Sequence, residues 1–482
     1  MLSKMSQLLI DRLVSHVLET PFEAFSSADI NAAKMNLIDA LGCNLSGRGA
    51  EGNDAVSQVL SNMGGFPQAS ILASDEKLPL AHAAMINSLQ TRSFDFEVCG
   101  PEPEGENAGK MVGHVASTTV PVALNVGEFV NATGEQLLAA TILGGDLAAR
   151  ISVSNTFNFD KDFEVCGTSN AFGAAAITGR LLGLTHDELR NAFGILINLL
   201  SGTYQGLWDG VASFKLPGAT AAYNGILSCQ LSQTGFKGVD DALESRLGFY
   251  HLYTPDPHPE DALIDLGQVF YVNGQHKLHP SCYGNHNAIN CATELHEEHG
   301  LNAENIESVT LEVHAPLMDH FLNQAPTNDD DQARFLFSLP YALANSLHRG
   351  KPELGHFTGE AIRDPQVVEL SQRVVLEPNL QDGFLYAAKI RVKTTDGKEI
   401  ENTASTPPSG WLENPATYAD IVEKFWRNVD FRQDISRENA QRALELLAEL
   451  ENVSDVSELA QVLSLETTEP ELVGQLAETA QN

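Results

Sequence analysis

The stretch Gly134–Ser152 has the sequence GEQLLAATILGGDLAARIS, with its apolar residues at helical spacing. Many of these positions are Ala or Gly, which allow neighbouring helices to approach closely. Outward from this stretch, the first half of the chain repeats the same pattern in five further segments: Ala32–Leu45, Ala81–Leu89, Val115–Phe129, Ala171–Leu182 and Ala221–Gln233. The first half is therefore predicted to be a buried bundle of helices.

The character of the chain changes near residue 263. Alternating Val, Leu and Tyr predict strands at Leu263–Val272 and Ser308–His314. A hairpin is predicted from Leu385–Thr395 and Lys398–Thr403, because Asp396-Gly397 between them suits a type I′ turn. Helices are expected between these strands, at Asn287–His299 and Ala333–His348. The middle of the chain is thus predicted to be an α+β domain.

The helical pattern returns after Trp411, at Thr417–Arg427 and Arg437–Leu450. The predicted fold is mainly α, a large all-helical domain interrupted by a smaller α+β domain. The predicted boundaries are 1–262 for the first helical part, 263–408 for the α+β domain and 409–482 for the helical return. From Ala443 onward the chain contains acids but no Lys or Arg. This end is interpreted as a solvated acidic helix and tail, or alternatively as a docking tail for a basic partner.

Charge and composition exclude several classes of function. The 482 residues include 64 acids and 29 bases, a formal charge of −35 without any Lys/Arg-rich stretch. Such a surface repels nucleic-acid phosphates and anionic lipids, so neither partner is expected. No apolar run approaches the roughly 20 residues of a spanning helix, and the N-terminus lacks a secretory pattern. The six cysteines contain no C-x-x-C pair and are interpreted as reduced thiols, which predicts a cytoplasmic protein.

The best cluster of cationic side chains lies at residues 276–286. It contains His276, Lys277, His279 and His286, together with Cys282. An acidic protein that binds an anionic metabolite must gather its few cations locally, so this cluster is a candidate anion site. A chance cluster on a solvated turn is the alternative. Metal ligation is not favoured, because no carboxylate accompanies these residues at ligand spacing.

A second candidate is Phe94-Asp95-Phe96-Glu97, followed by His114 at the start of an Ala/Val-rich helix. Desolvation between two Phe rings raises the pKa of an acid towards that of a general base. His114 would hold a substrate carboxylate beside the free N–H groups of the helix. A structural acid and a capping or surface histidine are the alternatives.

Other motifs are weaker, and several common ones are missing. Cys166–Ala176 is interpreted as a capped helix start that could meet an anion or simply pack in the core. Lys215–Gly218 and Ser338–Tyr341 carry little signal alone. The chain contains no G-x-S-x-G, Walker or H-E-x-x-H motif, so the commonest hydrolase, NTPase and metalloprotease classes are not expected.

The order of these motifs resembles the MmgE/PrpD family, which includes 2-methylcitrate dehydratases and cis-aconitate decarboxylases. The resemblance covers nearly the whole chain. The similar segments are Asn87-Ser88 with Phe94–Glu97, Gly113–Ser117, Gly167–Ala176, Lys277 to Pro280 with His286, and Phe337–Ala342. They are similar to the family's N-G…D-F-D-D, H-P-S, G-T-x-x-x-F-G-A-A-A, K-x-x-P…H and F-S-L-x-Y-A patterns.

The resemblance implies a helical domain interrupted by an α+β lid, a site between them, a homodimer and chemistry without metal or organic cofactor. It places Asp95, His114, Lys277 and Tyr341 at catalytic positions. Lys277 and His114 would stabilise charge, and Asp95 or Tyr341 would move protons. Lys215 matches the family's K-x-L-H-x-G only loosely. The predicted substrate-binding residues are Lys215, Glu164, Cys99, Cys282 and His286.

The chain departs from the family pattern at three of these positions. Cys99 stands where the family commonly has Thr, and Glu164 and Cys282 stand where it usually has His. Losing two imidazoles and gaining a carboxylate changes the charge of the site. The expected substrate therefore carries fewer carboxylates than methylcitrate, or one amine, and Glu164 would be an extra base or an amine anchor.

The resemblance predicts abstraction of a proton α to a carboxylate in a small di- or tricarboxylic acid. Elimination of water, as in 2-methylcitrate dehydratase, is the preferred reading. Epimerisation of the iminodisuccinate type and decarboxylation of the cis-aconitate type use the same carbanion chemistry and stay open. A non-catalytic binding protein with a degraded site is the further alternative.

Overall fold

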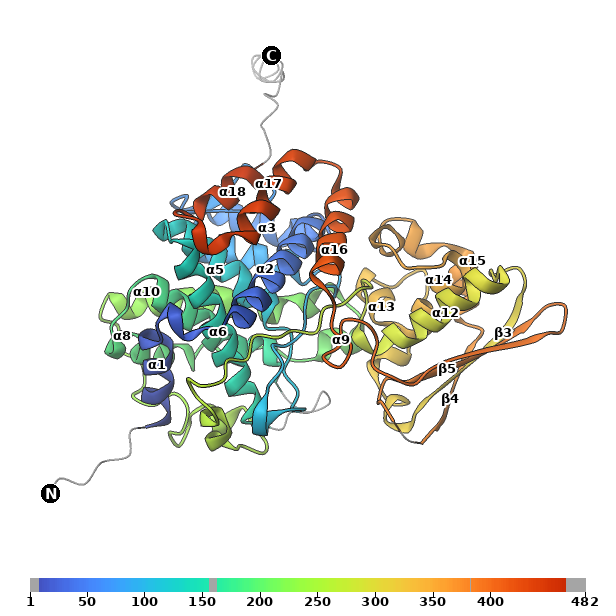
Figure 1. Ribbon diagram of the computed structural model, residues 1–482, viewed down its shortest axis with the longest axis horizontal. Helices are drawn as coiled ribbons and strands as arrows, with labels where there is room; N and C mark the ends of the chain where they lie inside the picture. The colour runs from blue at the N-terminus through green and yellow to red at the C-terminus, as the bar shows by residue number, and fades with distance from the viewer. Residues whose placement is uncertain (1–7, 156–162, 382, 465–482) are drawn as a thin grey trace, which may run out of the picture.

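The computed structural model describes residues 8–155, 163–381 and 383–464. They form two parts (Figure 1), a helical body and a smaller lobe of helices and strands. The lobe contains α12–α15 and β3–β6 and is called the lid below. The predicted class, mainly α with a smaller α+β region, is confirmed. The acidic tail beyond residue 464 lies outside the described residues.

The helical body is built around α7 (Ser169–Leu181), which packs against α5, α6 and α10. Small residues permit this packing. A Cβ added at Gly144 of α6 would lie 2.3 Å from Ile177 of α7, and one at Gly173 would lie 2.6 Å from the carbonyl oxygen of Gly144. The helices of the body are α1 (Leu9–Glu19), α2 (Ser27–Gly47), α3 (Asn53–Met63), α4 (Leu80–Thr91), α5 (Ala116–Val130), α6 (Gly134–Val153), α7, α8 (His186–Leu196), α9 (Gln205–Asp209), α10 (Leu216–Gln233), α11 (Phe249–Leu252), α16 (Tyr418–Arg432), α17 (Arg437–Ala448) and α18 (Ser457–Leu463). A two-residue pair, β1 (Ala69–Ser70) and β2 (Lys77–Leu78), lies beside them.

Helix α6 is apolar and long enough to cross a membrane, and it is the single such helix among the described residues. Its apolar stretch is 94% buried by the surrounding helices. The composition of α6 is therefore that of a central core helix, in keeping with its contacts to α5 and α7.

The lid is a four-stranded sheet covered by helices. Its strand order is β4 (Val374–Leu380), β3 (Ile306–His314), β5 (Ala388–Thr394) and β6 (Glu399–Ala404). β3 and β4 are parallel, whereas β3–β5 and β5–β6 are antiparallel. The β5–β6 hairpin turns at Gly397, whose φ of +87° suits glycine. Helix α12 (His286–His299) packs on β5, β6 and α14 (Leu339–Arg349), while α13 (Gln332–Phe337) and α15 (Pro365–Ser371) complete the lid.

The predicted strand at Leu263–Val272 is wrong, because this segment is a loop after a short turn of 3-10 helix. Its backbone groups bond to side chains of α6 instead of a neighbouring strand. The Arg150 guanidinium donates to the carbonyls of Ile264 and Val269, and the Asp146 carboxylate accepts from the Tyr271 N–H at 2.8 Å. The predicted helix Ala333–His348 is likewise two helices, broken at Ser338, whose side chain caps α14.

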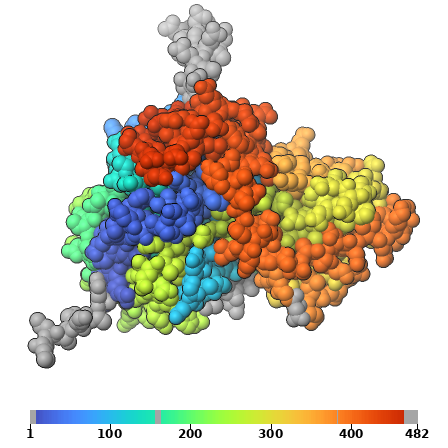
Figure 2. Space-filling model, in the orientation of Figure 1, coloured from blue at the N-terminus to red at the C-terminus, as the bar shows by residue number. Residues whose placement is uncertain are grey.

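The body and the lid meet through aromatic residues and the returning chain. Phe94, Phe96 and Phe214 share one apolar cluster with the lid, and the Phe214 ring lies 5.0 Å from that of Phe337. On the body side, Lys424 of α16 pairs with Asp39 of α2, and both side chains are fully buried. Figure 2 shows the orange-red segment that leads into α16 lying across this junction.

Candidate active site

The site begins where α4 ends. Arg92 caps the helix, and the chain then turns so that the Asp95 N–H bonds to the Arg92 carbonyl at 3.3 Å. Asp95 has a φ of +47°, a left-handed conformation that Asp tolerates better than most residues. The neighbouring Phe94 and Phe96 are buried, which holds the turn in place. The Asp95 carboxylate is consequently fixed inside the protein, at the junction of body and lid.

Lys277 reaches Asp95 from a loop 182 residues further along the chain. The backbone of Gln275 pairs with that of Cys99 in both directions, at 2.9 and 3.0 Å, and this aligns the loop with the Asp95 segment. The Lys277 ammonium donates to the Asp95 carbonyl and to its carboxylate, each at 2.7 Å. The side chain of Lys277 is 1% exposed, so its charge is balanced chiefly by Asp95.

His114 is the second cation-forming group brought to this place. Gly100 pairs with the chain on either side of His114, and the His114 Nδ1 lies 2.8 Å from the Glu97 carboxylate. Nδ1 therefore carries the proton in the neutral ring, and Nε2 is left as the acceptor. A Cβ at Gly113 would lie 2.2 Å from Val165, so only glycine allows this close approach.

Arg92 joins the two carboxylates. Its Nη1 contacts a carboxylate oxygen of Asp95 and lies 3.3 Å from Glu97, while the guanidinium carbon lies 5.1 Å from the centre of the Phe214 ring. The Arg92 Nε is buried and has no hydrogen-bond partner. Two carboxylates and two permanent cations thus form one buried network with His114 at its edge.

The network determines which groups are ionised. Burial acts to raise the pKa of Asp95, but Lys277 and Arg92 together lower it by more. The pKa therefore lies well below its usual range. For Glu97 burial is outweighed by Arg92 and His114, and its pKa is also lowered. Burial, Arg92 and Lys277 all lower the pKa of His114. Both carboxylates are therefore anions and His114 is a neutral imidazole at neutral pH.

Glu164 differs from the other two acids. It precedes the turn that leads into α7, and it is 2% exposed. Burial raises its pKa to about 7, against a smaller lowering by Arg92 and by a hydrogen bond with Cys166. One of its carboxyl oxygens, Oε2, has no partner. Glu164 consequently exchanges a proton near neutral pH, as an acid or base catalyst must.

Three of the predicted residues are partly exposed and mark the side from which a ligand can approach: Cys99, His114 and Cys282. The Cys99 sulfur lies 3.6 Å from Nδ1 of His114. Burial raises the pKa of the Cys282 thiol to about 11, and it raises that of Cys99 further. Both residues are thus neutral thiols at the mouth of the network.

The other predicted residues lie around the network or away from it. Lys215 donates to the Glu51 carbonyl at 2.6 Å and to Asn53 at 2.7 Å, and burial lowers its pKa to about 8. His286 stacks on Tyr283 at the start of α12. Neither has a hydrogen bond to Asp95 or Glu97 in the described structure.

Tyr341 is the predicted catalytic residue that the structure does not bring to this network. Its hydroxyl donates to the His356 carbonyl at 3.3 Å, and its ring packs edge-on against Phe335 and Phe357. Tyr341 is fully buried in the lid. These contacts do not support the expectation that Tyr341 moves a proton in the reaction.

Asp95, Glu97 and His114 also have the composition of a metal site, since one ligand atom from each lies within 4.8 Å of the others. Arg92 and Lys277 contact both oxygens of Asp95, and Arg92 and His114 share Oε1 of Glu97, whereas Oε2 of Glu97 has no hydrogen-bond partner. A metal ion bound to Asp95 would have to displace one of these two buried cations. The arrangement fits an organic anion at the edge of the network better.

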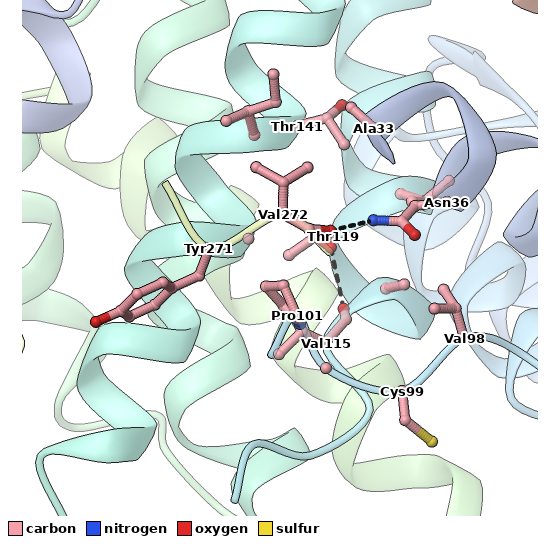
Figure 3. Close-up of a pocket in the computed structure, with 15 residues that line it drawn as sticks. Ala33, Asn36, Val98, Cys99, Pro101, Val115, Thr119, Thr141, Tyr271 and Val272 are labelled. Atoms are coloured by element: carbon pink, nitrogen blue, oxygen red, sulfur yellow. Dashed lines mark hydrogen bonds between the residues drawn. The ribbon is translucent and has the colours of Figure 1, made fainter. Parts of the chain in front are cut away.

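A small pocket lies behind Cys99 (Figure 3), between α2, α5 and α6. Its volume is about 30 Å³, and its lining is mostly apolar, with Val98, Val115 and Val272 among its residues. The Cys99 sulfur points away from it (Figure 3). The pocket offers no cation for a carboxylate, so it supports the packing of the Cys99 segment and is not the ligand site.

The sequence did not predict Arg92 as a member of the network, nor that Glu97 orients His114. Glu97 was visible within the Phe94–Glu97 motif, two residues after Asp95. Arg92 gave the one further signal, a basic residue three positions before an acid at a helix end. That spacing is common on exposed helices, and only the turn at Asp95 converts it into a buried contact.

Residues 11–262 match the MmgE/PrpD N-terminal domain, and residues 279–450 match the MmgE/PrpD C-terminal domain. A cis-aconitate decarboxylase-like protein, oryM, of Aspergillus oryzae is 24% identical over 462 residues, 90% of this chain and 93% of its own length. A cis-aconitate decarboxylase of Aspergillus terreus is 22% identical over 467 residues, 92% and 93% of the two chains. With both domains matched in order, the chain belongs to the MmgE/PrpD family.

Proposed function

We propose that the protein is a lyase that removes water from a small di- or tricarboxylic acid, without an organic cofactor. The observation that carries the proposal is the network of Asp95, Lys277, Glu97 and His114, with Glu164 nearby in a form that exchanges protons near neutral pH. Family membership and the named decarboxylases among its relatives support an enzyme of small carboxylic acids.

The neutral His114 is the proposed base. Its Nδ1–H is held by Glu97 at 2.8 Å, which leaves the Nε2 lone pair to take the proton α to a substrate carboxylate. Glu97 then stabilises the imidazolium that forms. Asp95 is a poor base by comparison, because Lys277 and Arg92 hold its pKa well below its usual range.

Lys277 is the proposed electrostatic partner of the substrate carboxylate. Two of its three N–H donors bond to Asp95, and the third remains for a carboxylate oxygen on which charge develops. Asp95 fixes the direction of the ammonium, so that little reorganisation accompanies the reaction.

Glu164 is the proposed acid for the leaving group. The electron pair of the broken C–H bond forms the C=C bond, the C–O bond breaks, and the departing hydroxide takes the proton of Glu164 to become water. A carboxyl group with a pKa of about 7 still holds its proton just below pH 7, where His114, whose pKa is lowered from 6.5, is already neutral. A base, His114, and a separate acid, Glu164, suit dehydration better than decarboxylation, which needs a single proton transfer.

The charge of the site supports a substrate with few carboxylates. Lys277 and Arg92 are matched by Asp95 and Glu97, and the described structure brings no further unpaired cation into contact with them. An anion of high charge would meet a nearly neutral network. A dicarboxylate with one hydroxyl group therefore suits it better than a tricarboxylate.

Decarboxylation is the second candidate, and the names of the Aspergillus relatives favour it. There the carboxylate itself leaves as CO2, and Glu164 would protonate the carbanion. One experiment separates these reactions. Purified protein is incubated in D2O with hydroxy-dicarboxylates, 2-methylcitrate, citrate and cis-aconitate, and proton NMR spectra are followed.

A new vinyl signal from a hydroxy acid would support dehydration, and CO2 release with a methylene product would support decarboxylation. Deuterium uptake at Cα with an unchanged skeleton would instead indicate an epimerase and would overturn the dehydratase. If every compound, including the dicarboxylates, stays unchanged, the lyase proposal fails.

A further inference from the structure

Arg92 occupies a position that the proposed chemistry does not yet use. Its guanidinium contacts Asp95, which holds Lys277, and Glu97, which holds His114. His114 also joins the two carboxylates, since its Nε2 lies 3.6 Å from Asp95, but its ring is neutral. Among the ion pairs of the described residues, Arg92 is the permanent cation that contacts both carboxylates. Its side chain is only 4% exposed, so it cannot exchange these partners for water.

We propose that Arg92 is a positioning residue, which keeps the proton acceptor His114 and the ammonium of Lys277 at a fixed separation by bridging the carboxylates that orient them. The proposal rests on the proposed function, in which His114 takes the proton and Lys277 binds the carboxylate. It adds a residue that acts through its neighbours, with no contact to substrate required.

The geometry calls for a guanidinium in particular. Both contacts come from Nη1, the far nitrogen of the guanidinium, whereas the ammonium of lysine ends a stem one bond shorter and would fall short of at least one carboxylate. The ring of Phe214, 5.1 Å below the guanidinium carbon, supports its flat face. Lysine at this position would keep the charge but lose the bridge.

The charge of Arg92 also reaches the two groups that exchange protons. It lowers the pKa of Glu164 against the effect of burial, and it adds to burial in lowering that of His114. The other charged or titratable groups that act on Glu164 are Cys166, on its own turn, and Asp95. His114 is faced by Lys277, Glu97 and Asp95 as well. Removing the Arg92 charge should therefore raise both pKa values.

Two substitutions separate position from charge. Arg92→Lys keeps the charge and loses the bridge, and Arg92→Gln loses both. Arg363→Gln is the matched control, because Arg363 also lies over a buried ring, that of Phe335, but has no contact with the network. For each protein, kcat and KM are measured from pH 5 to 9 on the substrate found by NMR.

We expect Arg92→Lys to lower kcat about 100-fold, the effect of a catalytic group displaced by about 1 Å, with both limbs of the pH profile unmoved. Arg92→Gln should lose at least as much, with both limbs displaced to higher pH. The acid limb moves because His114 must lose its proton to act, and the alkaline limb moves because Glu164 must keep one. A role confined to stability would lower the amount of folded enzyme without moving either limb.

A second readout does not depend on turnover. The side-chain carboxyls of glutamate are labelled with 13C, and the Glu164 signal is assigned from its loss in Glu164→Gln. We expect its titration midpoint to lie near 7 in the parent, to rise in Arg92→Gln and to stay in place in Arg92→Lys. Unchanged pH limbs and an unchanged midpoint in Arg92→Gln would overturn the proposal. If the parent turns over no compound but the Glu164 midpoint rises in Arg92→Gln, the proposed function is refuted. The effect of the Arg92 charge on Glu164 is then still supported.

Discussion

The ammonium of Lys277 lies 2.7 Å from both the backbone carbonyl and the carboxylate of Asp95. One residue thus presents two acceptors to the same cation, from a backbone in the left-handed conformation. The pair couples the loop at residue 277 to the end of α4. It also orients the ammonium whose charge the proposed reaction uses.

The first prediction concerns Lys277. Lys277→Ala should lower kcat/KM about 100- to 1,000-fold, the usual cost of removing one preorganised group that stabilises transition-state charge. Lys393→Ala is the control, because Lys393 pairs with Glu307 on the exposed lid sheet. Steady-state kinetics would check this, and a Lys277→Ala enzyme as active as the control would contradict the role of Lys277.

The second prediction concerns His114 and the acid that orients it. His114→Gln should cost about 100- to 10,000-fold in kcat, the range of general base catalysis. Glu97→Gln should also lower kcat, because the amide no longer fixes the Nδ1–H tautomer. The two effects should not add in the double variant, since both act on one proton transfer. Additive losses would mean that Glu97 acts independently of His114.

The third prediction concerns pH and stability at Glu164. A carboxyl whose folded pKa is about 7, against an ordinary value of 4.5, favours folding below pH 4.5 relative to high pH, and this advantage is lost as the pH rises through 7. Glu164→Gln has no such loss. Between pH 5 and 8 the free energy of unfolding of the parent should therefore fall, relative to the variant, by on the order of 3 kcal/mol.

Urea unfolding of both proteins at each pH tests this third prediction, because titrations common to the two cancel in the comparison. Equal pH dependence would show that Glu164 titrates near its ordinary value. The alkaline limb of kcat/KM should also disappear in Glu164→Gln if this group is the acid.

The fourth prediction concerns the buried pair of Lys424 and Asp39. Lys424→Met should lower the free energy of unfolding by about 3–5 kcal/mol, because it leaves the Asp39 carboxylate buried without its partner. Asp39→Asn combined with Lys424→Met should recover part of that loss. Lys393→Met, which breaks an exposed pair, should leave the unfolding midpoint in place.

The fifth prediction concerns Tyr341. Tyr341→Phe removes a hydroxyl that donates to the His356 carbonyl, which should reduce stability by about 1 kcal/mol. Because the hydroxyl bonds within the lid, kcat/KM should stay close to that of the parent. A loss comparable to that of His114→Gln would show that the lid rearranges to bring Tyr341 to the substrate.

Much of the fold could be predicted because its pattern is local. The helical spacing of Gly134–Ser152 needs no partner to be recognised, and α6 ends within one residue of it. The strand Val374–Leu380 was missed, since most of its side chains are partly or fully exposed and show no clean alternation. The segment Leu263–Val272 failed for the opposite reason: its apolar residues are buried, but against α6 through side-chain hydrogen bonds that no pattern reveals.

The sequence predicted which residues form the site better than it predicted how they pair with one another. The order of motifs brought Asp95, His114 and Lys277 forward together, and the structure places all three in one network. The acid expected to be a base is instead held ionised by Lys277 and Arg92. The pKa of Asp95 depends on which cations lie nearest to it in space, and the spacing of residues along the chain does not show this.

The pairing of Asp39 with Lys424 has a consequence for the way the chain is made. The two residues are 385 positions apart, yet α2 needs α16 to neutralise a charge in its buried face. At about 5–20 residues per second, a ribosome delivers Lys424 about 20 to 80 seconds after Asp39. During that interval the face of α2 that α16 covers has no partner, and the whole lid is synthesised before α16 can cover it. The order of synthesis therefore means that the body which supports the site is completed only after the lid has been made.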